Sequence, residues 1–151
     1  MFEEGNLLLF TPFYFKNGAL PQPKFFLVLK VCDGNMLLAS LPTSKDHVPS
    51  DMSVKSGCFE DSKRQVNVFV FLAGESVACH PLTNREFAFS LNTFVYGADL
   101  DTYPVSVFEK QIADHLSEVN LIGKILGPVY RDLRECLKHS RMVKNKYKRL
   151  F

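Results

Sequence analysis

A polar segment that follows an apolar run contains the residue types needed for phosphate chemistry. The stretch "LASLPTSKDHVPSD", from Leu38 to Asp51, places Thr43 and Ser44 directly before Lys45. Hydroxyl and backbone N–H donors beside a fixed ammonium group can surround a phosphate and stabilise the charge that develops during its cleavage. The alternative is an ordinary surface turn, because Pro, Thr, Ser and Asp favour turns for local backbone reasons.

Two further side chains complete a candidate catalytic set. His47 lies two residues beyond Lys45 and is the natural proton donor or acceptor of the segment, although a solvated loop histidine is the alternative. Lys24 opens an apolar strand after "PQP", and it would complete a phosphate clamp if loops 16–23 and 42–64 flank one cleft. The predicted catalytic residues are Thr43, Ser44, Lys45, His47 and Lys24.

Other chemistries have weaker support in the sequence. The chain contains no GxxxxGK[ST], GxGxxG, HExxH or GxSxG motif, so no nucleotide cofactor is expected. The segment 99–103, "DLDTY", resembles a metal loop, but carboxylates before a helix more often complement its dipole, so no metal is expected. His80 is interpreted as structural, and His115 and His139 as ordinary helix or tail residues.

Positive charge is concentrated at one end of the chain. Residues 131–151 contain eight basic and two acidic residues, which gives this segment a net charge of +6. The whole chain has a net charge of +2, so residues 1–130 carry −4. Such a tail suits RNA or an acidic protein, and Tyr147 and Phe151 are available to stack on bases; the alternative is a solvated helix end. The predicted RNA-binding residues are Lys45, Arg64, Arg141, Lys144, Lys146 and Lys148.

Length and apolar patterning predict a single α+β domain over residues 1–151, built as a small antiparallel SH3-like barrel with one or two C-terminal helices. Residues 1–103 supply the barrel strands and loops, with a hairpin turn at Asp33-Gly34. Pro42 to Gln65 reads as one long loop. Residues 104–151 supply the helices, one possible strand at "LIGKILG" and the basic tail.

The helices are predicted from their apolar spacing. One apolar stripe of an amphipathic helix is formed by Val105, Phe108, Ile112, Leu116 and Val119, and Asp101 or Thr102 is the expected cap. A second helix begins near Pro128 and turns four residues inward, namely Val129, Leu133, Cys136 and Leu137.

The cysteines and the apolar runs bear on location. Four cysteines are widely spaced without a CxxC pair, so they are interpreted as reduced thiols, mostly in the core. The apolar runs are far shorter than the roughly 20 residues that cross a bilayer, and the start of the chain lacks a secretory signal pattern. A cytoplasmic protein without membrane contact is therefore expected.

The plan of the first part of the chain resembles a known family. A "GN" followed by an apolar strand, a Pro-bounded loop leading into "PKFFLVL", a hairpin and "LASLPTSK" resemble the PemK/MazF toxins and the related ToxN-type toxins. The resemblance implies an SH3-like barrel that cleaves single-stranded RNA without metal, by attack of a ribose 2′-hydroxyl that leaves a cyclic phosphate. It also implies restraint by an antitoxin protein or RNA, and a homodimer.

The resemblance assigns roles to matching residues and also shows departures. Thr43 and Ser44 would hold or polarise the scissile phosphate, and Lys45 would neutralise its developing charge. The family usually has an arginine before the proline of the second strand, whereas here Pro23 precedes Lys24, which keeps the charge but loses the bidentate fork. No general base matches the family pattern, so His47 is the physical candidate.

Two other functions are compatible with the same sequence. A non-catalytic SH3-like module could bind RNA or an acidic protein through Lys45 and the tail, and it would tolerate loss of the hydroxyl groups. A toxin that poisons a protein target, as the CcdB toxins do, would use the C-terminal segment as its docking element.

Overall fold

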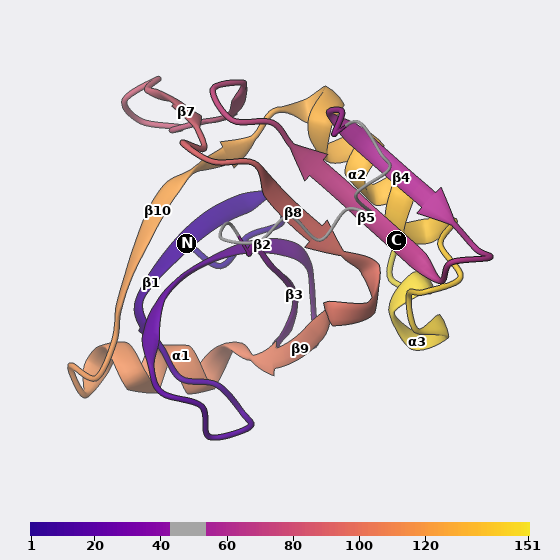
Figure 1. The fold of residues 1–151 in the computed structure, drawn as a ribbon. Helices are drawn as coiled ribbons and strands as arrows, with labels where there is room; N and C mark the ends of the chain where they lie inside the picture. Colours follow the sequence, from indigo (N-terminus) through magenta and orange to yellow (C-terminus); the bar gives the residue numbers. More distant parts are fainter. Residues whose placement is uncertain (43–53) are drawn as a thin grey trace.

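In a computed structural model, the described residues, 1–42 and 54–151, form a mixed α+β fold of mainly antiparallel strands (Figure 1). This confirms the predicted class. The strands of these residues are β1 (Asn6–Phe13), β2 (Gln22–Cys32), β3 (Asn35–Ser40), β4 (Gly57–Asp61), β5 (Val66–Phe71), β6 (Ser76–Cys79), β7 (Glu86–Ala88), β8 (Thr93–Tyr96), β9 (Asp101–Pro104) and β10 (Glu118–Ile125). The helices are α1 (Val105–Ala113), α2 (Gly127–Lys138) and α3 (Asn145–Lys148), with a 3-10 turn η1 at Gly97–Asp99.

The strands form two sheets, and every described pairing is antiparallel. The larger sheet has the order β7-β6-β10-β1-β2-β3-β9, and the smaller one has the order β4-β5-β8. In the described residues the edge strands β7 and β9 do not pair with each other, so the sheets are not closed into a barrel. An SH3-like barrel is therefore not confirmed and stays a prediction.

The centre of the large sheet follows from local sequence. Asp33 and Gly34 have φ angles of 50° and 75°, which turn the chain tightly between β2 and β3 and confirm the predicted hairpin. Leu27 is paired with Leu7 of β1 on one side and with Ala39 of β3 on the other. All three of these side chains are buried. These strands are apolar runs because other layers of the fold cover both faces of the sheet.

Each face of the large sheet packs against a different layer. One face, which carries Leu7 and Leu27, packs with the small sheet and with Leu133 of α2. The opposite face packs on α1, where the rings of Phe10 and Phe108 lie 5.0 Å apart. In Figure 1, α1 lies at one end of the large sheet and α2 lies behind β4 and β5. The site described below lies where the two sheets meet.

The first helix is shorter than its apolar stripe predicts. α1 ends at Ala113, and His115 has a φ of 56°, a left-handed conformation that ends the helix. Leu116 is therefore exposed in a turn, and Val119 belongs to β10. The predicted side-chain cap is also wrong, because Asp101 and Thr102 lie in β9 and Pro104 occupies the N-cap position.

Several strands were not expected from the sequence. β4 lies inside the predicted long loop, and β6 and β9 are short strands of four residues each. The possible strand at "LIGKILG" is confirmed as part of β10, which lies inside the large sheet between β1 and β6. α2 begins at Gly127 and buries Leu133, Cys136 and Leu137, as predicted.

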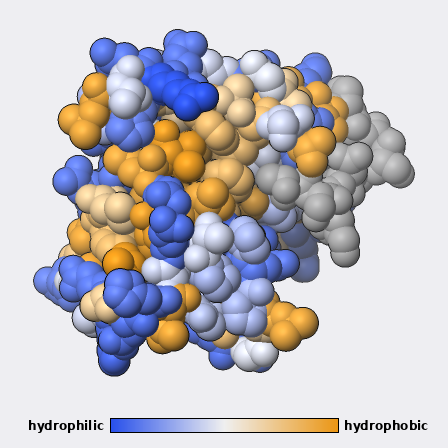
Figure 2. All heavy atoms as spheres, turned by 90° about the vertical axis from the view of Figure 1, so that its left-hand side faces the viewer, coloured by the Kyte–Doolittle hydropathy of each residue, from blue (hydrophilic) through white to orange (hydrophobic). Residues whose placement is uncertain are grey.

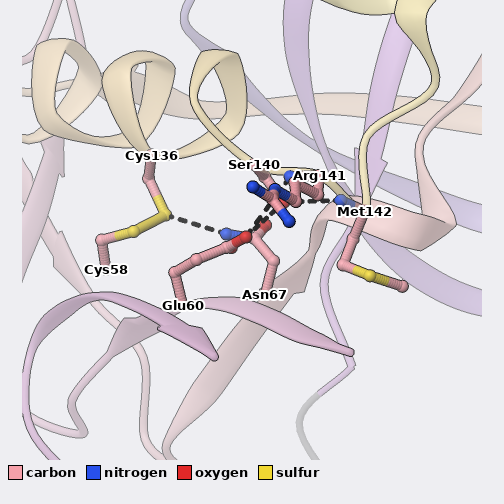
Figure 3. The surroundings of a disulfide bond; sticks show 7 residues. All are labelled: Cys58, Glu60, Asn67, Cys136, Ser140, Arg141 and Met142. Atoms are coloured by element: carbon pink, nitrogen blue, oxygen red, sulfur yellow. Dashed lines mark hydrogen bonds between the residues drawn. A yellow bond between two sulfur atoms is a disulfide. The ribbon is translucent and has the colours of Figure 1, made fainter. Parts of the chain in front are cut away.

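The prediction of four reduced cysteines is wrong. A disulfide joins Cys58 of β4 to Cys136 of α2, with a Cα–Cα distance of 5.6 Å, whereas Cys32 and Cys79 are free (Figure 3). The inward face of α2 lies on β4, which brings together residues 78 positions apart. Beside the bond, the Glu60 carboxylate accepts hydrogen bonds from Ser140 Oγ (3.5 Å) and the Arg141 N–H (3.3 Å), which hold the end of α2 on the same strand.

No helix in the described part of the chain has the length and the apolar character needed to span a membrane.

Gly97 fills a position with no room for a side chain. A Cβ at this position would clash with Asn67 Oδ1 and lie 2.9 Å from Val143 Cγ2. We expect Gly97→Ala to lower the free energy of unfolding by about 1–3 kcal/mol, the usual cost of overpacking. Urea unfolding measures this, with Gly127→Ala as the control because nothing lies within 4 Å of its added Cβ. Equal midpoints for the two variants would contradict the packing argument.

Candidate functional site

A cleft of about 390 Å³ lies where the two sheets meet. Its lining comes from both sheets and from the connections that follow them: Lys24, Ser40, Pro42, Tyr96 and Asp99. We call this the Lys24 cleft. It combines an ammonium group, a carboxylate and a hydroxyl group on apolar walls, the mixture expected of a polar ligand site.

Backbone pairing sets the positions of these side chains. Ser40 is the last residue of β3 and pairs with Phe26 of β2, which places it at the same end of the hairpin as Lys24. Beyond Ser40, the Leu41 N–H donates to the Phe25 carbonyl (3.3 Å). The Pro42 carbonyl then accepts a hydrogen bond from the Phe94 N–H of β8 (3.3 Å), so the chain crosses from one sheet to the other at the cleft.

The acidic side of the cleft comes from the end of β8. Tyr96 is the last residue of this strand, and η1 follows at once and ends at Asp99. Asp99 is exposed, and the Tyr96 hydroxyl oxygen is buried. The carboxylate is thereby presented to solvent at the cleft, and the tyrosine ring forms part of its wall.

Lys24 is half-buried, and its surroundings shift its pKa. Burial lowers the pKa of Lys24, and the Asp99 carboxylate raises it in part, with the net result below the value of an ordinary lysine. A cation that is partly removed from water interacts more strongly with an incoming anion than a solvated one does. The cleft can therefore hold an anionic group at Lys24 and offer Asp99 as a proton acceptor.

The structure describes only one of the five predicted catalytic residues. Lys24 lines the cleft, as its place at the mouth of the sheet predicted. Thr43, Ser44, Lys45 and His47 lie outside the described residues. Thr43 follows Pro42 directly in the sequence, and Pro42 lines the cleft.

Asp99, Tyr96 and Ser40 are cleft residues that sequence reasoning missed. The segment "VYGAD" places Asp99 just after a buried strand, which is a signal for a side chain at the end of a sheet. The sequence also allows Asp99 to complement the dipole of a following helix, and that interpretation concealed the signal. Ser40 gave no signal, because a serine at the end of a strand is common in turns.

None of the described RNA-binding candidates lines the Lys24 cleft. Arg64 follows β4 and lies 3.5 Å (Nε) from Asp61 Oδ2, and Lys45 is outside the described residues. The others lie beyond α2: Arg141, Lys144 and Lys146 are exposed, and Lys148 is half-buried.

The expectation that Tyr147 stacks on bases is wrong. Tyr147 is only 3% exposed, and its hydroxyl donates to Asp101 Oδ1 (3.4 Å). Lys146 Nζ lies 4.9 Å from the centre of its ring and covers it. The C-terminal segment is therefore packed on the fold through this ring, with its cations outward.

A larger hollow of about 730 Å³ lies beside β10 and β7. Figure 2 shows this side of the molecule, with apolar side chains in the middle of the face and hydrophilic residues above and below. Its polar lining residues are His80, Thr83, Arg85 and Glu86. His80 Nδ1 accepts hydrogen bonds from the Leu82 and Thr83 N–H groups (3.2 and 3.3 Å). His80 thus organises a turn, which confirms its structural interpretation, and we prefer the smaller Lys24 cleft as the functional site.

The remaining described histidines, His115 and His139, do not line the Lys24 cleft. His115 is exposed, and His139 Nε2 lies 3.0 Å from Glu135 Oε2 on the same helix. Within residues 1–42 and 54–151, no three His, Cys, Asp or Glu side chains gather closely enough to hold a metal ion.

Comparisons of the chain with protein-family models, with curated protein sequences and with solved structures find no significant match.

Proposed function

We propose that this protein is a metal-independent endoribonuclease of toxin–antitoxin type that cleaves single-stranded RNA at the Lys24 cleft. The observation that carries the proposal is that Lys24 and Asp99 line one cleft together with Pro42, the residue just before Thr43, Ser44 and Lys45. One peptide bond joins the cleft residue Pro42 to Thr43.

The chemistry requires a proton acceptor, a proton donor and a cation. The ribose 2′-hydroxyl loses its proton to Asp99, and its oxygen bonds to the adjacent phosphorus atom. The bond from phosphorus to the 5′-oxygen then breaks, and this oxygen takes a proton from His47, leaving a 2′,3′-cyclic phosphate and a 5′-hydroxyl. Lys24 and Lys45 stabilise the extra negative charge on the phosphorane, and the Thr43 and Ser44 hydroxyl groups position it.

The electrostatics of the cleft support this division of roles. A lysine whose pKa is lowered by burial is a cation with part of its hydration already removed, so it gains more from a developing phosphorane charge. Asp99 is exposed, so a ribose hydroxyl can approach its carboxylate. The half-buried ring of Tyr96 forms part of the cleft wall beside these groups.

The wider family plan belongs to the same proposal. An SH3-like core is supported by the consecutive antiparallel strands β1, β2 and β3. An antitoxin, protein or RNA, would restrain the activity by covering the Lys24 cleft. A homodimer would be measured by light scattering coupled to size-exclusion chromatography.

The test uses purified protein, excess EDTA and a mixed-sequence single-stranded RNA. We expect cleavage to fragments with cyclic-phosphate and 5′-hydroxyl ends, mapped by end-specific labelling and mass spectrometry. The matched control is the same sequence with 2′-O-methyl groups, which lacks the attacking hydroxyl and should stay intact.

Each outcome of this test has a distinct consequence. Cleavage of the methylated strand would exclude 2′-hydroxyl attack, because water would then be the nucleophile. Intact unmodified RNA, with the protein folded by circular dichroism, would overturn the enzyme proposal and favour the non-catalytic binding module.

A further inference from the structure

Another hollow, of about 240 Å³, lies on α2 and shares no residue with the Lys24 cleft. Its basic lining residues recur along one helix face at spacings of three and four residues, and the C-terminal Phe151 folds back to close it. We call this hollow the α2 groove; it is lined by Gly127, Tyr130, Arg131, Arg134, Glu135, Lys138 and Phe151.

The cations of the α2 groove are available to a ligand. Arg134 and Lys138 form no ion pair within the described residues, and Arg131 contacts only Asp132, its chain neighbour, at 3.3 Å. The single carboxylate of the lining, Glu135, lies 3.0 Å from His139. Two guanidinium groups and an ammonium group therefore face a small hollow, which is the donor set that binds a phosphate.

The aromatic residues of the groove are held in place by the fold. The Tyr130 hydroxyl donates to the Leu29 carbonyl of β2 (2.6 Å), and burial raises the pKa of Tyr130 to about 12, so the phenol stays neutral. The Arg134 guanidinium lies 5.7 Å from the centre of this ring. Phe151 is half-buried against the main core cluster and also lines the groove. A fixed ring beside cations is the arrangement on which a base stacks.

The charge around the groove indicates a polymer as the ligand. Residues 131–151 carry a net +6, and the exposed Arg141, Lys144 and Lys146 follow α2 toward its C-terminal side. An acidic peptide would satisfy the charges but would offer no planar base for Phe151. A single-stranded nucleic acid satisfies both features.

We propose that the α2 groove binds one nucleotide of single-stranded RNA outside the Lys24 cleft, with its phosphate on Arg131, Arg134 and Lys138 and its base on Phe151. The inference rests on the proposed function in taking RNA as the ligand. Its test is independent of cleavage, because it uses a strand that lacks the attacking hydroxyl.

The test measures binding of a fluorescein-labelled 2′-O-methyl RNA by anisotropy, from 50 to 200 mM salt, to disulfide-intact protein. We expect Arg131→Gln/Arg134→Gln/Lys138→Gln to weaken binding at least tenfold. The slope of log K against log salt should fall by roughly 0.7, the value for one lost phosphate contact on a single strand. The matched control removes the same charge from exposed lysines elsewhere, as Lys63→Gln/Lys110→Gln/Lys124→Gln, and should bind within twofold of wild type.

Base stacking is tested separately. Phe151→Ala should weaken binding about tenfold with the salt slope unchanged, and an abasic strand should bind wild type as weakly as the intact strand binds this variant. Equal weakening by the groove variant and its control would overturn the proposal, because net charge alone would then explain binding. Equal affinity for intact and abasic strands, or for a polyglutamate of the same charge, would also overturn it.

Discussion

Replacing Lys24 with methionine is expected to reduce the rate of RNA cleavage about 10²–10³-fold, the usual cost of losing one preorganised group that stabilises transition-state charge. Methionine has a similar length and no charge, and Lys24 is already half-buried at an energetic cost to its ammonium group. The folded state should therefore keep its stability or gain some. Single-turnover cleavage and urea unfolding, measured on the same preparation, separate the two effects.

The control for this substitution lies in the same strand. Lys30→Met removes a lysine of β2 that pairs with Glu4 (3.0 Å) outside the cleft, and it should cleave RNA at the wild-type rate. Lys24→Arg should recover part of the activity because it restores the charge. Loss of activity in Lys30→Met, or full activity in Lys24→Met, would contradict the role of Lys24.

The pH profile provides an independent reading of the same site. Burial lowers the pKa of Lys24, so the lysine loses its proton at a lower pH than a solvent-exposed lysine does. The rate of RNA cleavage should therefore begin to fall at that lower pH. The Asp99 carboxylate raises this pKa, so Asp99→Asn should move the alkaline limb to still lower pH while reducing the rate. An alkaline limb that does not move in Asp99→Asn would show that Lys24 does not set it.

Opening the Cys58–Cys136 disulfide is expected to lower the free energy of unfolding by about 4.5 kcal/mol. The chain-entropy model gives this value for a bond that closes a loop of 78 residues, because the oxidised unfolded chain is strongly restricted. Urea unfolding with and without a phosphine reductant measures the change. After reduction, amide exchange should rise first in α2 and β4, which the bond joins.

The free cysteines supply the matched control. Cys32→Ser/Cys79→Ser should leave the oxidised protein's stability within about 0.5 kcal/mol and keep its response to reductant. Cys58→Ser/Cys136→Ser should be as unstable as the reduced protein and insensitive to reductant. Identical midpoints with and without reductant would contradict the bond. Disulfides persist in oxidising compartments and are rare in the cytosol. A bond shown by this measurement would therefore count against the cytoplasmic location expected from the sequence.

Local patterns in the sequence were enough to predict the elements that depend on neighbours along the chain. The Asp33-Gly34 hairpin and α2 were predicted correctly, because a turn needs its own φ angles and an amphipathic helix shows its period over a few turns. Lys24 lines the cleft, and its catalytic role stays a prediction. β4 was missed because its alternation of half-buried and exposed residues is short and lies inside a turn-rich segment.

The sequence alone thus determined the α+β class and the central hairpin. The tertiary structure decided which distant residues meet: Asp99 with Lys24, and Cys58 with Cys136. It also decided that Tyr147 is buried rather than free to stack. These outcomes depend on how two sheets and α2 pack on one another, and such packing buries side chains from separate parts of the chain without leaving any periodic signal in the residues between them.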